Sequence, residues 1–148
     1  MNAPWPVIVA TVLSLVATGC GKDDEVGPKP DELTGFWHAT KLEYVSKANP
    51  ATRVDVIALG GAATLAIRID HTVEWIITES GSAPDTTTGT WSLDGDLFQV
   101  TPTGSPWSWT WDVSLSGGTL ALSGADVEYD FDGDDLLEDA DQNVVLVH

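Results

Sequence analysis

The sequence has a single cysteine, Cys20, and only six basic residues, none of which follows Arg68. One cysteine excludes an intrachain disulfide, so the fold must be held together by a hydrophobic core. The scarcity of Lys and Arg argues against nucleic acid as a partner, because phosphate binding depends on clustered basic side chains. The 23 acidic residues give a net charge of −17, and the length of 148 residues suits one domain.

Only one apolar run is long enough to suggest targeting, at residues 7–16 (VIVATVLSLV). It is shorter than the roughly 20 residues that span a bilayer, and it has the length of a signal-peptide core. The run ends in Ala17-Thr18-Gly19 before Cys20, which resembles the lipobox of bacterial lipoproteins. The alternative is an apolar leading strand with a buried thiol.

The lipobox resemblance implies a signal peptide over residues 1–19 and a diacylglyceryl group on the Cys20 thiol, which would anchor the protein to a membrane. Residues 20–33, rich in Gly, Pro and charge, are predicted to be a flexible tether. Gly21 and Lys22 follow the cysteine, so the aspartate that favours inner-membrane retention is missing. We therefore expect an outer-membrane lipid anchor in the cell envelope, on its periplasmic or surface-facing side.

From Thr34 onward, apolar residues alternate with polar ones and short Gly, Pro and Asp turns separate the runs, a pattern typical of β-strands. No window of a dozen residues in this part of the sequence shows helical periodicity. Closing such strands into a barrel, or packing them as a sandwich, removes exposed edges. The expected strands lie near residues 36–46, 52–58, 63–70, 72–79, 88–94, 97–102, 107–116, 119–131 and 142–148.

Two motifs carry a family resemblance. Gly35-Phe36-Trp37 resembles the G-x-W signature at the first strand of lipocalins, and the segment Gly89 to Asp96 is similar to a hairpin of bacterial lipocalin-like lipoproteins. The similarity covers most of residues 34–148. It implies an all-β, antiparallel up-and-down β-barrel of about eight strands over 34–148, and a non-enzymatic protein that binds or carries a small apolar molecule.

The candidate ligand-binding residues are tryptophans. Trp107, Trp109 and Trp111 alternate along one predicted strand, so they share a face. Aromatic walls suit a flat apolar or sugar-like ligand, but the same side chains can instead fill the barrel completely. The full candidate set is Trp37, Trp75, Trp91, Trp107, Trp109 and Trp111.

The acidic stretch VEYDFDGDDLLEDADQN resembles an EF-hand-type calcium loop when it is aligned from Glu128. Alternate side-chain oxygens can converge on one ion while Gly133 permits the sharp turn. The expected Ca²⁺ ligands are Glu128, Asp130, Asp132, Asp134 and Asp139. A second frame would use Asp130, Asp132 and Asp134 with Asp141, and the alternative to both is a solvated acidic hairpin.

Enzymatic motifs are scarce. His38, His71 and His148 are too far apart in the sequence to show a metal-binding spacing, and the sequence has no G-x-S-x-G, P-loop or H-E-x-x-H motif. Besides a ligand carrier, two functions remain open. One is a structural or interaction lipoprotein with a packed core and a calcium-stabilised acidic loop, and the other is a hydrolase with a His and an acid in a cleft.

Overall fold

The structure is a computed structural model that describes residues 27–148. The predicted signal peptide and Cys20 lie outside the described residues. Among residues 27–148, the helix is too short and too polar to span a membrane.

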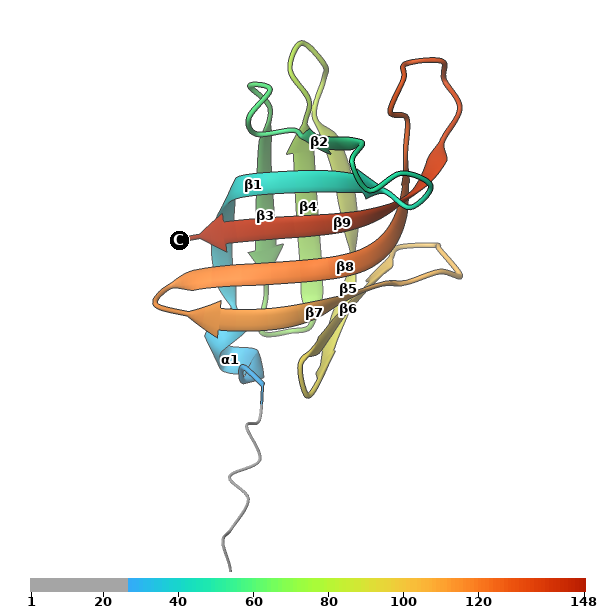
Figure 1. The fold of residues 1–148 in the computed structure, drawn as a ribbon. Coiled ribbons are helices and arrows are strands. Elements are labelled where there is room, and N and C mark those ends of the chain that lie inside the picture. Colours follow the sequence, from blue (N-terminus) through green and yellow to red (C-terminus); the bar gives the residue numbers. More distant parts are fainter. Residues whose placement is uncertain (1–26) are drawn as a thin grey trace, which may run out of the picture.

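The described chain forms a closed antiparallel barrel of eight strands with one additional short strand (Figure 1). β1 pairs with β3, and from β3 onward each strand pairs with the next along the chain. β1 also pairs with β9, which closes the barrel, while β2 pairs only with the end of β1. The all-β up-and-down barrel predicted from the sequence is therefore confirmed. The strands are β1 (Gly35–Ser46), β2 (Arg53–Asp55), β3 (Ala62–Ile67), β4 (Thr72–Thr78), β5 (Asp85–Asp94), β6 (Leu97–Pro102), β7 (Trp109–Ser116), β8 (Thr119–Tyr129) and β9 (Glu138–Val147).

The two ends of the barrel differ. Short turns and the helix α1 (Pro30–Leu33) lie at one end, which we call the closed end. The longer connections lie at the other, the open end, where the β8–β9 loop projects beyond the strands (Figure 1). The open-end connections are residues 47–61, 79–84, 103–108 and 130–137.

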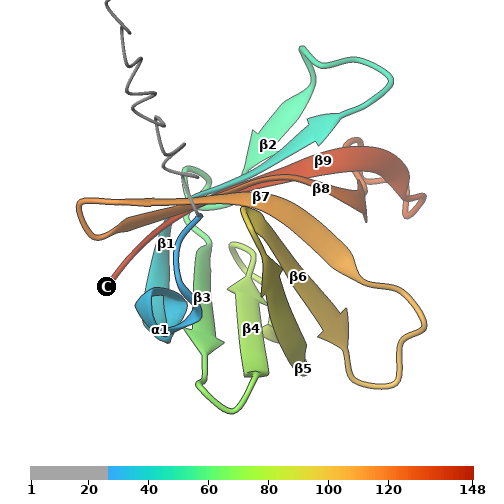
Figure 2. The same ribbon diagram turned by 90° about the horizontal axis from the view of Figure 1, so that it is seen from below.

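The closed end is capped by α1, which lies beside the ends of β1 and β3 (Figure 2). Pro30 occupies the first turn, where its missing N–H costs nothing, and the Glu32 carboxylate accepts a hydrogen bond from the Lys29 amide at 2.7 Å. Leu33 is completely buried, and its carbonyl accepts a hydrogen bond from Trp37 Nε1 at 2.9 Å. Residues 30–33, predicted to belong to the tether, are thus part of the folded domain.

The core follows the alternation read from the sequence. Trp109, Trp111 and Val113 of β7 point inward, and Asp112 between them is exposed. The first-strand tryptophan, Trp37, is completely buried and lies against the His148 ring with ring centroids 3.7 Å apart. Deep burial of so many large side chains is the main stabilising term of the barrel. The largest fully buried side chains are Trp37, Phe98, Leu33, Leu42, Leu65, Ile67, Leu120, Leu122, Leu146, Val73 and Val144.

Candidate functional site

The barrel contains a pocket of about 310 Å³ at its open end, which we call the open-end pocket. This volume lies at the lower limit of the range typical of small-molecule sites. The wall combines large apolar side chains with a few polar ones. The lining residues are Tyr44, Trp75, Ile77, Asp85, Thr87, Trp109, Val127, Glu128, Leu137 and Gln142.

Aromatic side chains from three strands form the apolar part of this wall. Tyr44 comes from β1, Trp75 from β4 and Trp109 from β7, so the rings reach the pocket from well-separated parts of the chain. Each lies on the inward-facing row of its strand. Aromatic side chains offer large flat surfaces with few rotatable bonds, which suits them to contact a planar or apolar ligand.

A buried polar pair lies beside these rings. Gln142 of β9 donates a hydrogen bond from Nε2 to the Tyr44 hydroxyl at 3.1 Å. The Tyr44 ring stacks on Tyr129, with ring centroids 4.2 Å apart and an interplanar angle of 15°. Burial raises the pKa of Tyr44, and the hydrogen bond with Gln142 opposes that rise. Both tyrosines therefore remain neutral hydrogen-bonding groups at physiological pH.

Below the pocket, the barrel interior is filled by side chains. The residual space between Trp75, Trp109 and Trp111 is about 10 Å³, at most enough for one water. Among the described residues, the Trp111 indole Nε1 is buried with no hydrogen-bond partner. The structure therefore combines both alternatives left open by the sequence, since some tryptophans fill the core and others line a pocket.

The six candidate tryptophans are distributed over three regions. Trp75 and Trp109 line the open-end pocket, and Trp111 lies below it. Trp37 and Trp91 lie at the closed end, where Trp91 Nε1 donates to the Arg68 carbonyl at 2.9 Å. They are therefore placed as core residues away from this pocket.

Trp107 departs from the expected pattern. The strand predicted to begin at residue 107 begins at Trp109, and Trp107 is 78% exposed. The physical reason is a local turn: the Ser105 hydroxyl accepts a hydrogen bond from the Trp107 amide and donates one to its carbonyl, at 3.1 and 3.2 Å. Those backbone groups consequently do not join the sheet, and Trp107 lies outside the inward row.

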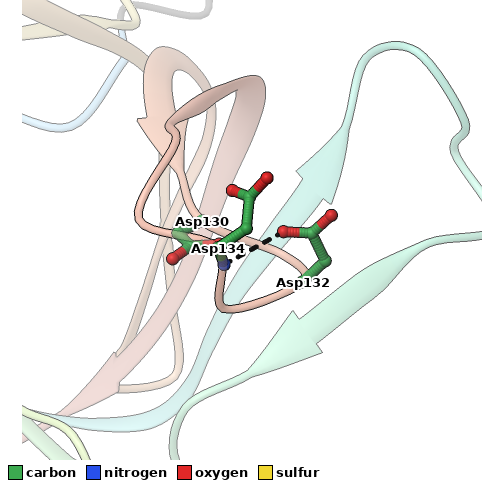
Figure 3. Close-up of side chains that lie close together, drawn as sticks. All are labelled: Asp130, Asp132 and Asp134. Atoms are coloured by element: carbon green, nitrogen blue, oxygen red, sulfur yellow. Dashed lines mark hydrogen bonds between the residues drawn. The ribbon is translucent and has the colours of Figure 1, made fainter.

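The β8–β9 loop brings three of the five predicted calcium ligands together. A carboxylate oxygen from each of Asp130, Asp132 and Asp134 lies within 4.8 Å of the others (Figure 3). Glu128 and Asp139 are paired directly across β8 and β9 and are not members of this group, nor is Asp141 of the second frame. The strand pairing explains the difference, because β9 begins at Glu138 and holds Asp139 in extended backbone.

Backbone amides already hold the loop carboxylates in place. Asp130 accepts hydrogen bonds from the amides of Gly133 at 2.7 Å and Asp135 at 3.0 Å. Asp132 accepts one from the Asp134 amide at 3.2 Å (Figure 3). Loss of hydration would raise the pKa of Asp130, but these amide hydrogen bonds outweigh it and leave the pKa lowered. The loop backbone therefore favours the ionised form of Asp130.

Asp132 behaves in the opposite way. Loss of hydration raises its pKa, and the negative charge of Asp134 adds to the rise, against the hydrogen bond from the Asp134 amide. Carboxylates held this close repel one another unless a cation neutralises them. The arrangement can therefore bind a cation, or it can remain a solvated acidic turn.

The histidines lie apart from the open-end pocket. His71 and His148 contact Trp91 and Trp37 at the closed end, and His38 lies against the exposed Phe36. The pocket lining contains acids but no histidine. The described residues thus offer no His–acid pair within the pocket.

Comparison with known proteins found no relative of this chain. This chain matches no family model, no curated protein and no solved structure.

Sequence reasoning did not identify several pocket residues. Tyr44, Gln142, Asp85 and Thr87 were not among the candidates, although each lies on the inward row of a strand near the open end. Alternation alone could have placed Tyr44 inside, since it shares its strand face with Leu42. Nothing local in the sequence marks Gln142 as the partner of Tyr44.

Proposed function

We propose that this protein is a non-enzymatic, lipid-anchored cell-envelope protein whose barrel binds or carries a small apolar molecule in the open-end pocket. The observation that supports this function is the pocket itself, of about 310 Å³ and walled by Trp75, Trp109 and Tyr44. A barrel filled throughout would favour a purely structural role instead.

The position of α1 is consistent with a lipid anchor. The described chain begins at the closed end, where Gly27 lies against the β5–β6 turn and α1 leads into β1. An anchor at Cys20 would therefore lie nearer the closed end, with the pocket opening away from the membrane. Intact-mass measurement of the protein purified from bacterial membranes tests this. A mass without acyl chains on Cys20 would contradict the anchor.

Ligand binding is tested with the neutral apolar fluorophore N-phenylnaphthylamine. We expect its fluorescence to rise on binding, and we expect Trp109→Ala to weaken binding because that ring lines the pocket. The matched control is Trp107→Ala, which removes the same side chain from an exposed position on the same segment. If the two variants bind the probe as tightly as the unmodified protein, the open-end pocket is not the binding site. Native mass spectrometry of the purified protein would identify a co-purifying molecule.

A second candidate function is a structural role for the acidic loop. We propose that Ca²⁺ binds Asp130, Asp132 and Asp134 and stiffens the β8–β9 connection beside the open end. The convergence of these three carboxylates within 4.8 Å supports it. Ca²⁺ takes about six to eight oxygen ligands, so these three carboxylates would supply part of the shell, and backbone carbonyls or waters would complete it. Such a site would hold the loop and need not take part in chemistry.

A further inference from the structure

The charge of the open-end pocket differs from what a general carrier of apolar molecules requires. One carboxylate on an inward-facing row, that of Asp85, is among its lining residues, whereas Glu128 shares the outward row of β8 with Asp126. None of the described Lys or Arg residues lines it. The pocket therefore combines an aromatic wall with negative charge that no neighbouring base neutralises.

The basic residues nearest in the chain to the open end are engaged elsewhere. Lys47 contacts Asp126 at 2.7 Å and Asp141 at 3.5 Å, on the outer face of β8 and β9. Arg53 of β2 contacts Glu43 at 3.5 Å, and Lys41 contacts the same carboxylate at 3.1 Å. These cations are held by acids outside the pocket.

The connections around the open end add more negative charge. Glu79 lies in the β4–β5 connection, and Asp130, Asp132, Asp134 and Asp135 lie in the β8–β9 loop. A concave site surrounded by charge of one sign raises the local concentration of oppositely charged solutes. It also disfavours entry of anions such as fatty-acid carboxylates.

We propose that the open-end pocket selects cationic amphiphiles, that is, small molecules that carry an ammonium group on an aromatic or aliphatic body. This inference rests on the proposed ligand-binding function and specifies its substrate class. The apolar body packs between Trp75 and Trp109, and the ammonium group lies near Asp85 at the rim. Thr87 and Gln142 offer neutral hydrogen-bonding groups in the same wall.

Two interactions favour the cation over a neutral molecule of the same shape. An ammonium group over an indole or phenol face gains cation–π attraction. Asp85 is solvent-exposed, so its ion pair with the ligand adds only a modest gain in affinity. Together these predict a preference of roughly threefold or more for the amine.

The test uses three probes with the same phenyl body and different charge: phenethylamine, phenethyl alcohol and phenylacetate. Isothermal titration calorimetry of the purified protein gives the three affinities. We expect phenethylamine to bind most tightly and phenylacetate most weakly, and we expect added salt to reduce the amine affinity while leaving the alcohol affinity unchanged.

Variants that neutralise single carboxylates show which of them causes the preference for the amine. Asp85→Asn should reduce the preference for phenethylamine over phenethyl alcohol and leave alcohol binding intact. Asp112→Asn, which neutralises an exposed carboxylate on the outer face of β7, is the matched control and should preserve the preference. Unchanged alcohol binding also shows that the Asp85→Asn variant is folded.

The outcomes separate this inference from the proposed function. Equal affinities for the three probes, or tightest binding of phenylacetate, would overturn the selection for cations while ligand binding stands. Binding of N-phenylnaphthylamine without measurable binding of phenethylamine would overturn it as well. Failure of N-phenylnaphthylamine itself to bind would overturn the proposed ligand-binding function.

Discussion

Tyr44 and Gln142 lie directly opposite each other on β1 and β9, and their side chains are joined by a buried hydrogen bond of 3.1 Å. These two strands are the pair that closes the barrel. The polar contact therefore lies at the closing seam and also in the wall of the open-end pocket. The same two side chains therefore belong both to the strand pair that closes the barrel and to the pocket wall.

Replacing both members of this pair should cost less than the sum of the two single replacements. Tyr44→Phe leaves the Gln142 amide without its buried acceptor, and Gln142→Leu leaves the Tyr44 hydroxyl without its donor. Each single change is expected to lower the free energy of unfolding by about 1–3 kcal/mol. The double variant should lose less stability than the sum of the two single losses, because neither buried polar group is left without a partner. Urea unfolding of the four proteins measures the coupling, and strictly additive losses would show that the pair does not stabilise the seam.

The two tyrosines also predict a loss of stability at alkaline pH. Burial raises the pKa of Tyr129 to about 12, and the negative charge of Glu79 adds to the rise, against an ordinary value of 10.0. The folded protein therefore holds this proton more tightly than the unfolded chain does. Its stabilising contribution is complete below pH 10 and is lost as the pH rises from about 10 to about 12.

Tyr129→Phe should reduce this alkaline loss. The measurement is the free energy of unfolding in urea across that pH range, with tyrosinate absorbance as a direct record of ionisation. The chain has only two tyrosines, so in the variant the tyrosinate absorbance comes from Tyr44 only. A tyrosinate midpoint in the folded protein equal to that of the urea-unfolded chain would contradict the prediction.

Much of the fold was predictable because alternation of apolar residues is a local property. The rows containing Leu65, Trp75 and Trp111 point inward as their spacing predicts. Boundaries were less accurate where a side chain redirects the backbone, as Ser105 does before Trp107. The single turn of α1 was missed because four residues cannot show helical periodicity.

The candidate site was predicted only in part because a pocket depends on contacts between distant residues. Trp75 and Trp109 were identified by residue type, but whether they fill or line the barrel depends on how the strands curve. Asp130, Asp132 and Asp134 share one short loop, so sequence spacing was enough to group them. The other predicted ligands, Glu128 and Asp139, were separated from them by the β8–β9 pairing, which spacing does not encode.

Two buried tryptophans provide a matched test of hydrogen bonding in the core. Trp91 and Trp111 are 4% and 5% exposed, but only the Trp91 indole has a partner, the Arg68 carbonyl. Both Phe replacements lose similar apolar area, whereas only Trp91→Phe removes a hydrogen bond. We expect Trp91→Phe to destabilise the protein by about 1 kcal/mol more than Trp111→Phe. Equal losses in urea unfolding would indicate that Trp111 Nε1 finds a partner, such as a buried water.

The acidic loop predicts a dependence of stability on calcium. If Ca²⁺ binds only the folded protein, it stabilises the fold by mass action, by about 2.7 kcal/mol when its concentration is a hundred times the Kd. Addition of a chelator should then lower the melting temperature. Replacing Asp130, Asp132 and Asp134 together with Asn should abolish this response.

The same triple variant separates calcium binding from simple charge repulsion. Without calcium, it should be at least as stable as the unmodified protein, because Asn relieves the repulsion between carboxylates and its side-chain oxygen can still accept the backbone hydrogen bonds. With calcium, the unmodified protein should become the more stable of the two. Asp112→Asn, which removes one charge from the outer wall, should respond to calcium as the unmodified protein does. A melting curve unaffected by chelator in all three proteins would leave the loop as a solvated acidic turn, held by its own backbone amides.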